Sequence, residues 1–516
     1  MKTMKRANHL WVMMAIVFWG GPCLQGQSFK EPHRPQFHFT PEEAWMNDPN
    51  GMVYYEGEYH LFYQHYPYAS VWGPMHWGHA VSTDLVHWEH LPIALFPDEH
   101  GLIFSGSAVI DWNNTSGFGV GDKPPMIAIF TYHNMVGERT PGDQFQTQGI
   151  AYSLDKGRTW TKYEGNPVIS NPGIRDFRDP KVIWHEGTQR WVMILAAKDR
   201  LQLYTSPNLK DWTFASELGQ GSTPQLGVWE CPDLFPLEVE GTDQQKWVII
   251  ISHGGGGPNG GSCTRYMVGD FDGTIFTLDH PIEQVNWLDY GKDNYAGVTW
   301  SDIAAEDGRR LFLGWMSNWE YATRVPTTEW RSAMTIPRSL HLRETDQGLR
   351  LASKPVKELT ALRTSTTDIM TQTVSGHKRV MEEATLSEVE ISFDLANSDS
   401  RSFGVELANE AGEYIRLHYD PASSLIIIDR SNAGVMDFSP AFPGLHYVPI
   451  DLPADRMDWH IYFDKSSLEL FVNDGTYVVT DIFFPTRAFS QLSLFAFHGE
   501  AKVQAGKVHR LERIWD

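Results

Sequence analysis

The sequence predicts an all-β protein, in which a five-bladed β-propeller is followed by a C-terminal β-sandwich. Between about residues 30 and 340, helical periodicity is rare, and short β-branched or aromatic runs alternate with turns rich in Gly, Pro, Asn and Asp. Two sequence phrases recur through this region at intervals that suit four-stranded blades with inserted loops. From about residue 366, apolar and polar residues alternate strictly, which is typical of strands that bury one face.

Length and charge narrow the function. The 516 residues are too many for one ordinary core, so we expect two domains. Apolar residues make up 41% of the chain, and 20 Trp, 19 Tyr and 27 Phe offer many flat faces suited to sugar rings. The formal charge is −22, from 42 basic and 64 acidic residues, and such a surface repels phosphate backbones. We therefore expect no nucleic-acid partner.

Residues 1–26 are predicted to be a secretory signal peptide. A basic start is followed by an apolar run over 10–19, which is too short to span a bilayer. A lipid anchor on Cys23 is an alternative, although Pro22 fits a lipidation motif poorly. No other stretch looks transmembrane. We expect an exported mature protein that is periplasmic, extracellular or held at the cell surface.

The first recurring phrase has an acid at its head. Trp45-Met46-Asn47-Asp48-Pro49-Asn50-Gly51 is echoed at 178–184, and more loosely at 230–235. Each copy leads through a polar turn into an aromatic-rich strand. Asp48 is expected where a strand begins, with Asn50-Gly51 as a turn behind the rigid proline. Repeats that place equivalent strand ends around one centre would bring their acids together.

The second phrase closes each unit and gives the blade count. It occurs at 82–88, 153–160 and 206–212, with a weaker copy at 270–276, and a fifth unit runs from 295 to 315. The predicted propeller therefore covers 30–348 and is followed by a linker over 349–365, in which 354–363 is a short helix candidate. The predicted sandwich covers 366–516, with alternating strands at 388–395, 414–419 and 467–472 and a hairpin turn at 473–475. Its expected role is packing against the propeller; sugar binding is the alternative.

Three carboxylates stand at the heads of the units: Asp48, Asp179 and Glu230. Hydrolysis of a glycosidic bond needs two carboxyl groups beside it, one as proton donor and one as nucleophile or base. Glu230 follows Trp229 in an apolar setting that suits a proton donor, whereas amide neighbours favour an ionised, nucleophilic Asp48. Asp179 follows an arginine and could hold substrate hydroxyls. The alternative is that these acids only cap turns.

Four motifs in order carry a family resemblance: 45–51, Phe104-Ser105-Gly106-Ser107, Arg178-Asp179-Pro180 and Trp229-Glu230-Cys231-Pro232. Together they resemble glycoside hydrolase family 32, the invertases, inulinases and levanases, over nearly the whole mature chain. The resemblance implies a retaining double displacement at a fructosyl unit. It implies that Asp48 is the nucleophile, Glu230 the general acid and base, and Asp179 the transition-state stabiliser. Retention requires the Asp48 and Glu230 carboxyls to lie about 5–5.5 Å apart.

The same resemblance implies a set of side chains that hold the terminal fructose: Asn47, Gln64, Trp72, Phe104, Ser105, Arg178 and, as a weaker candidate, Trp315. The alternative is that Trp72 and Phe104 are core aromatics and Ser105 a turn residue. The 21 histidines include no HExxH motif and no paired ligand spacing. We therefore expect neither a catalytic metal nor a cofactor.

The predicted function is hydrolysis of β-fructofuranosidic bonds in levan or inulin, with sucrose as a further substrate. We expect exo action that releases fructose. An endo-levanase and a fructosyltransferase share the three acids and remain alternatives. Two other classes fit the scaffold less well: a non-catalytic glycan-binding protein, and an inverting propeller glycosidase with carboxyls about 6.5–9.5 Å apart.

Overall fold

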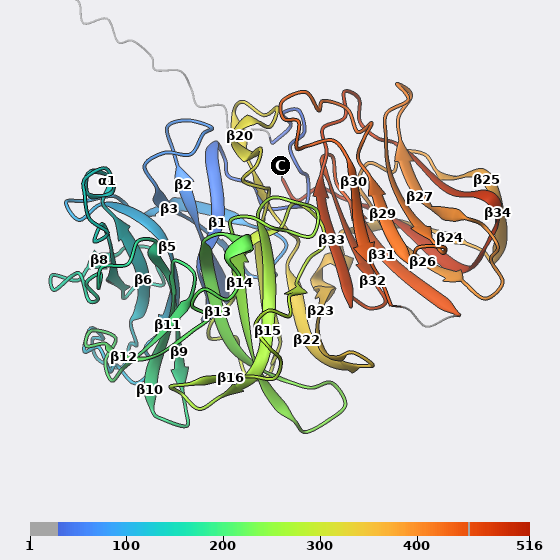
Figure 1. The fold of residues 1–516 in the computed structure, drawn as a ribbon. Helices are drawn as coiled ribbons and strands as arrows, with labels where there is room; N and C mark the ends of the chain where they lie inside the picture. The colour runs from blue at the N-terminus through green and yellow to red at the C-terminus, as the bar shows by residue number, and fades with distance from the viewer. Residues whose placement is uncertain (1–28, 452–454, 516) are drawn as a thin grey trace, which may run out of the picture.

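The computed structural model describes residues 29–451 and 455–515, and it places a propeller beside an elongated sheet domain (Figure 1). The predicted signal peptide, 1–26, and the lipidation candidate Cys23 lie outside the described residues. In the described part of the chain, every helix is too short or too polar to cross a bilayer. The two described cysteines, Cys231 and Cys263, are buried and free.

Five sheets, antiparallel except for the β20–β1 pair, form the propeller, as the sequence predicts. Blade one has the order β20-β1-β2-β3-β4, with β20(Trp330–Arg331), β1(Ala44–Tyr55), β2(Glu58–Tyr66), β3(His76–Ser82) and β4(Glu89–Leu95). Blade two has β5(Leu102–Ile110), β6(Met126–His133), β7(Gln146–Ser153) and β8(Thr161–Lys162), with the short helix α1(Met135–Glu138) between β6 and β7. Blade three has β9(Phe177–His185), β10(Arg190–Ala197), β11(Leu201–Ser206) and β12(Thr213–Leu218).

The last two blades carry short accessory elements. Blade four has β13(Trp229–Glu238), β14(Gln245–His253), β15(Cys263–Phe271) and β16(Phe276–Leu278), with β17(Asn286–Trp287) on β15 and the 3-10 turn η1(Pro224–Leu226) before it. Blade five has β18(Tyr295–Thr299), β19(Arg310–Met316), β22(Arg338–Thr345) and β23(Gly348–Pro355), with β21(Ala333–Met334) on β19 and η2(Ala322–Arg324) in the intervening loop.

The first strand of each blade lines the propeller axis, and each is interrupted by a β-bulge. These strands contact one another in the ring order β1, β5, β9, β13, β18 and back to β1. Their pairing shifts register beside Asn50, Ile103, Asp179, Glu230 and Tyr295. A bulge bends the strand and re-aims its side chains. The five bulges therefore set one ring of side chains around the axis.

The bulge in blade one replaces the turn that the sequence suggested at Asn50-Gly51. β1 is continuous from Ala44 to Tyr55, and Gly51 adopts φ 52° inside it. The left-handed conformation is therefore accommodated within the strand, not between two strands. Asp48 consequently lies within β1 and not at the start of a strand, as the sequence had suggested, and it falls in the register shift between Met46 and Pro49.

The ring is closed by a late segment of the chain. β20 pairs in parallel with β1, through Ala44 with Trp330 and Trp45 with Arg331. The backbone amide of Tyr54 also bonds to the carbonyl of Ser301 at 3.0 Å. The first blade thus depends on residues that lie 247 to 286 positions later in the sequence.

The C-terminal domain is built around one long strand, β34(Gln491–Leu511), which pairs with the two groups of strands on either side of it. β34 separates β27(Ser402–Ala408), β28(Tyr414–Asp420), β29(Leu425–Asp429) and β30(Leu445–Pro449) from β26(Ser387–Asp394), β31(Arg456–Phe463), β32(Ser467–Val472) and β33(Tyr477–Ile482). β24(Arg363–Ile369) and β25(Gln372–Met381) also pair with it. The predicted sandwich strands and the 473–475 hairpin, between β32 and β33, are present.

The segment expected as a linker is largely structured. Residues 349–365 contain most of β23, the 3-10 helix η3(Lys357–Leu362) and the start of β24. β23 pairs along its whole length with β22, so blade five extends past the predicted boundary at 348. The short helix expected within 354–363 corresponds to η3.

Buried ion pairs join the two domains. His38 of the propeller lies between Asp464 (2.8 Å) and Glu469 (2.9 Å) of the sandwich. These two carboxylates raise the pKa of His38 to about 9, although burial alone would lower it. Arg338 on β22 donates to the same Glu469, and all of these groups are buried. The domains therefore share one electrostatic network.

Candidate active site

The three predicted acids converge where the bulged first strands meet. Asp48 comes from β1, Asp179 from β9 and Glu230 from β13. Cys231 connects them, since its backbone amide donates to Asp179 Oδ2 at 3.0 Å and its thiol lies 3.5 Å from Asp48 Oδ2. Asp179 and Cys231 adopt φ 64° and 48°, values rare for side-chain-bearing residues. The backbone is thus strained where the carboxylates are positioned.

Asp48 is held by two donors. Ser105 Oγ donates to Asp48 Oδ2 at 2.6 Å, and Asn47 Nδ2 donates to Oδ1 at 2.9 Å. Asn47 is itself oriented by the indole N–H of Trp45, at 2.6 Å. Burial raises the pKa of Asp48, and the negative charge of Glu230 adds to this, while the two hydrogen bonds oppose it. The donors therefore favour the ionised form that a nucleophile needs.

Glu230 lies in a polar setting, which differs from the apolar one suggested by its sequence neighbours. Arg178 donates to Glu230 Oε1 through Nη2 at 2.9 Å, and the phenol of Tyr295 donates to Oε2. The neighbouring Trp229 is fully buried and stacks under Arg265, away from this contact. The adjacency in sequence was misleading because successive residues of a strand point to opposite faces.

Asp179 is the most buried of the three acids, with 6% of its surface exposed. Burial raises its pKa to about 7, with the charges of Glu230 and Asp48 adding to this, and Arg178, 3.8 Å away, lowers it only in part. Arg178 also bonds to Asp176 at 2.7 Å. One guanidinium is thus shared among three carboxylates, which fixes their relative positions.

The predicted binding residues divide into groups. Asn47, Ser105 and Arg178 contact the acids directly. A second group is aromatic. Phe104, in the bulge of β5, stacks on His133 with ring centroids 4.2 Å apart, and Trp72 contacts Phe104 edge-on. Trp72 is 38% exposed, as a rim residue should be.

Two predicted residues lie one layer behind the acids. Gln64 is buried and donates to the Asn50 side chain at 2.7 Å. Trp315 is completely buried and packs against Trp45, Trp319 and Tyr295. Its ring can therefore act on the site only through the residues that it supports.

Sequence reasoning missed Tyr295 and the linking role of Cys231. Tyr295 opens β18, the first strand of the fifth repeat, at the position where the repeats of blades one, three and four carry their acids. The signal in the sequence that could have found Tyr295 is its place at the head of the fifth unit. The position of Cys231 was not readable, since it depends on the left-handed backbone at that residue.

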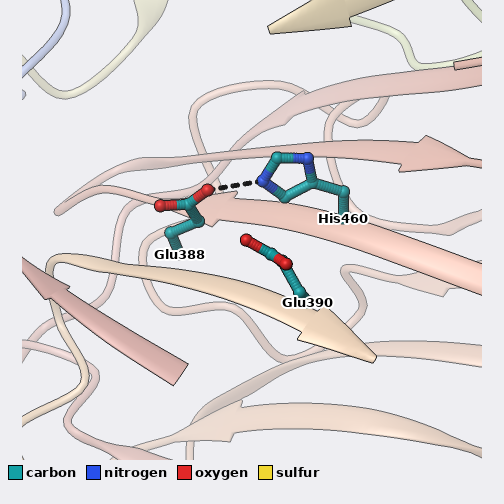
Figure 2. A group of neighbouring side chains, drawn as sticks. All are labelled: Glu388, Glu390 and His460. Atoms are coloured by element: carbon teal, nitrogen blue, oxygen red, sulfur yellow. Dashed lines mark hydrogen bonds and ion pairs between the residues drawn. The ribbon is translucent and has the colours of Figure 1, made fainter. Parts of the chain in front are cut away.

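One acidic cluster in the sandwich has the composition of a metal site but is an ion-pair network. Figure 2 shows Glu388, Glu390 and His460 pointing toward one another. Arg363 donates to both glutamates, to Glu390 at 2.7 Å, and the phenol of Tyr462 donates to Glu388 at 2.8 Å. The guanidinium occupies the carboxylate oxygens that a cation would need.

Two family models together match most of the chain. The model of the glycosyl hydrolase family 32 N-terminal domain matches residues 38–355, and that of the family 32 C-terminal domain matches 358–510. The chain belongs to glycosyl hydrolase family 32. It is therefore a glycosidase, and its two domains correspond to the two family domains.

Named relatives of this family 32 glycosidase are similar over most of their length. A levanase of Bacillus subtilis is 48% identical over 99% of this chain and 76% of its own. An extracellular exo-inulinase of Aspergillus niger is 38% identical over 95% of this chain and 96% of its own. The crystal structure of an exo-inulinase from Aspergillus awamori matches with a TM-score of 0.87 at 36% identity, over 94% of this chain and 100% of that one.

Proposed function

We propose that this glycosidase hydrolyses β-fructofuranosidic bonds in levan or inulin from the chain end, releasing fructose, and that it also cleaves sucrose. The observation that carries the proposal is the meeting of Asp48, Asp179 and Glu230 around Arg178 and Cys231. The relatives named levanase and exo-inulinase support the substrate class.

In the first step, an oxygen of Asp48 attacks the anomeric carbon of the terminal fructosyl unit. The bond to the leaving sugar breaks, and Glu230 gives its proton to the departing oxygen. The products of this step are a fructosyl ester on Asp48 and a shortened chain. Ser105 and Asn47, which bond to the carboxylate, keep it ionised and aimed.

In the second step, Glu230 takes a proton from water, and the hydroxyl oxygen attacks the same carbon. The ester bond to Asp48 breaks, and fructose leaves with its configuration retained. Asp179 is placed to accept hydrogen bonds from fructosyl hydroxyls while positive charge develops on the ring. Arg178 would hold the stabiliser and the acid in register through both steps.

The floor of the site supports action at a chain end. The floor of the site next to Asp179 is a void of about 10 Å³, lined by residues such as Gly51, Ser107 and Pro180, which has room for about one water molecule. A sugar ring is too large for this void, so a fructosyl unit that enters the site stops there, which supports action on a terminal unit.

Variants test the roles of the acids. We expect Asp48→Asn to reduce kcat on sucrose and levan by about 10⁴-fold or more. Glu230→Ala should lose activity on both substrates, because the departing oxygen then has no proton donor and the attacking water has no base. The control is Asp111→Asn, a buried aspartate whose oxygens cap the 115–116 turn instead. Full activity of Asp48→Asn would refute the proposal.

The products separate the modes of action. We expect free fructose from the first time points on levan, inulin and sucrose, detected by chromatography. Early oligosaccharides would assign endo action, and products longer than the substrate would assign transfer. NMR of the first product should show the retained anomer; the inverted anomer would exclude the double displacement.

We also propose that the enzyme is exported. The predicted signal at 1–26 and the extracellular relatives support this. N-terminal sequencing of the secreted protein should give a start close to residue 27. Incorporation of labelled palmitate that Cys23→Ala abolishes would show instead that the lipid anchor is used.

A further inference from the structure

A second cavity, of about 740 Å³, lies at the opposite end of the propeller axis from the acids. Strands β5, β9 and β13 contribute to the acid site near their first residues and to this cavity near their last. On β9, Asp179 belongs to the acid site, whereas residues from Lys181 to the exposed Glu186, just beyond the strand's end, line the cavity. Seven strand residues span about 23 Å. The exposed edge of the cavity at Glu186 therefore lies about 23 Å along the strand from the site that cleaves the substrate.

Tryptophan rings line this cavity. Among the described residues two tryptophans are exposed, Trp72 at the acid site and Trp112 at this cavity, where 60% of its surface is open. The indole N–H of Trp112 donates to Asp302 Oδ1 at 2.8 Å, so its ring is fixed in orientation. Trp184 and Trp247 are half-buried in the same wall. Rigid, flat, exposed rings offer stacking surfaces at little entropic cost.

The polar groups in the cavity are of mixed charge. Arg310 stacks over Phe235 at 5.1 Å and donates weakly to the Trp300 carbonyl at 3.4 Å. In the part of the chain that the structure describes, no carboxylate lies within ion-pair distance of Arg310, so its remaining N–H groups are available. Gln245 and Glu186 are exposed at the edge. Donors and acceptors of both signs beside aromatic faces suit an uncharged polyol better than an ion.

We infer that this cavity binds a second segment of the fructan substrate, with sugar rings on Trp112 and hydroxyls on Arg310 and Gln245. This inference rests on the proposed function. The cavity's volume of about 740 Å³ is in the range of cavities that hold small ligands. It can take a few sugar units but not a folded partner. A polymer bound in this cavity stays near the acid site. The effective concentration of its chain end at the acids therefore rises. A short substrate gains nothing, since it can occupy one site only.

The test compares a polymer with a disaccharide. We expect Trp112→Ala to raise KM for levan about three- to tenfold, as the loss of one stacking contact would, with kcat unchanged. KM and kcat for sucrose should stay unchanged. Trp112→Phe, which keeps an aromatic face, should retain most of the affinity, and Gln245→Ala should show the same selective rise. The matched control is Phe214→Ala on β12, an exposed aromatic outside the cavity.

Binding without turnover gives a second measurement. In Asp48→Asn, retardation in levan-containing native gels should weaken several-fold when Trp112→Ala is added. The inference would be overturned, and the proposed function left standing, by equal KM ratios of levan to sucrose in the wild type, Trp112→Ala and Gln245→Ala, together with equal retardation of Asp48→Asn with and without Trp112→Ala. Failure of the wild type to cleave any fructan would instead refute the proposed function, and the inference with it.

Discussion

The phenol of Tyr295 donates a hydrogen bond to Oε2 of Glu230, and so joins the first strand of blade five to the first strand of blade four. Both side chains stand at bulges of equivalent position. Burial raises the pKa of Tyr295 well above its usual value, and the charge of Glu230 adds to this, so the phenol remains a donor at every working pH. The proposed acid and base is thus oriented by a neutral group from the next blade.

We expect Tyr295→Phe to lower kcat and kcat/KM about 10- to 100-fold on sucrose and on levan alike. A hydrogen bond to a charged group contributes about 1.5–3 kcal/mol, and a misplaced Glu230 would lose that much in proton transfer. Steady-state kinetics measure the effect. Tyr321→Phe is the control, because its phenol bonds to Asp293 in the domain interface instead. Equal activity of Tyr295→Phe and wild type would remove Tyr295 from the mechanism.

Ser105→Ala should move the acidic limb of the pH profile of kcat/KM to higher pH. The Ser105 hydroxyl stabilises ionised Asp48, so its removal raises the pKa of Asp48 further, and more acid-side activity is lost. Ser107→Ala on the same strand removes a hydroxyl bound to the Pro180 carbonyl, and should leave the limb in place. A shift to lower pH in Ser105→Ala would contradict this arrangement.

His38→Gln should destabilise the folded protein more at pH 6 than at pH 10. The pKa of His38 is about 9 when folded against about 6.5 unfolded, so its contribution is complete below the unfolded value and disappears as pH rises through 9. The difference corresponds to roughly 3 kcal/mol. Thermal melts across this range measure it.

His60→Gln provides the opposite case. Burial lowers the pKa of His60 to about 4, so it stays neutral in the folded protein from pH 7 to 10. Its difference from the wild type should therefore be constant over that range. A pH trend equal in both variants would show that the His38 network does not control the stability of the interface.

Trp315→Phe should lower the free energy of unfolding by about 1–3 kcal/mol, because a smaller ring leaves part of a fully buried site unfilled. Its packing against Tyr295 and Trp45 predicts a fall in kcat with a smaller change in KM for sucrose. Trp72→Phe, on the exposed rim, should raise KM for sucrose with a smaller change in kcat. Denaturant titration together with kinetics on both variants distinguishes support from direct contact.

Much of this molecule was readable from its sequence because the blades repeat. The acid-Pro phrases marked the first strands of blades one, three and four, and strict alternation marked the sandwich. The apolar setting expected for Glu230 was wrong, since the directions of Trp229 and Glu230 depend on strand geometry. Two other features depend on tertiary packing, which no local pattern encodes. They are the full burial of Trp315 and the hydrogen bonds from Arg363 to the Glu388 cluster.

The parallel pairing of β20 with β1 has a consequence for biosynthesis. The strand that bears Asp48 acquires its partner on the side opposite β2 only after Trp330 and Arg331 have left the ribosome. Fragments that end earlier would leave this strand with an open edge and should be inert, so catalysis would begin only once the greater part of the polypeptide has been delivered.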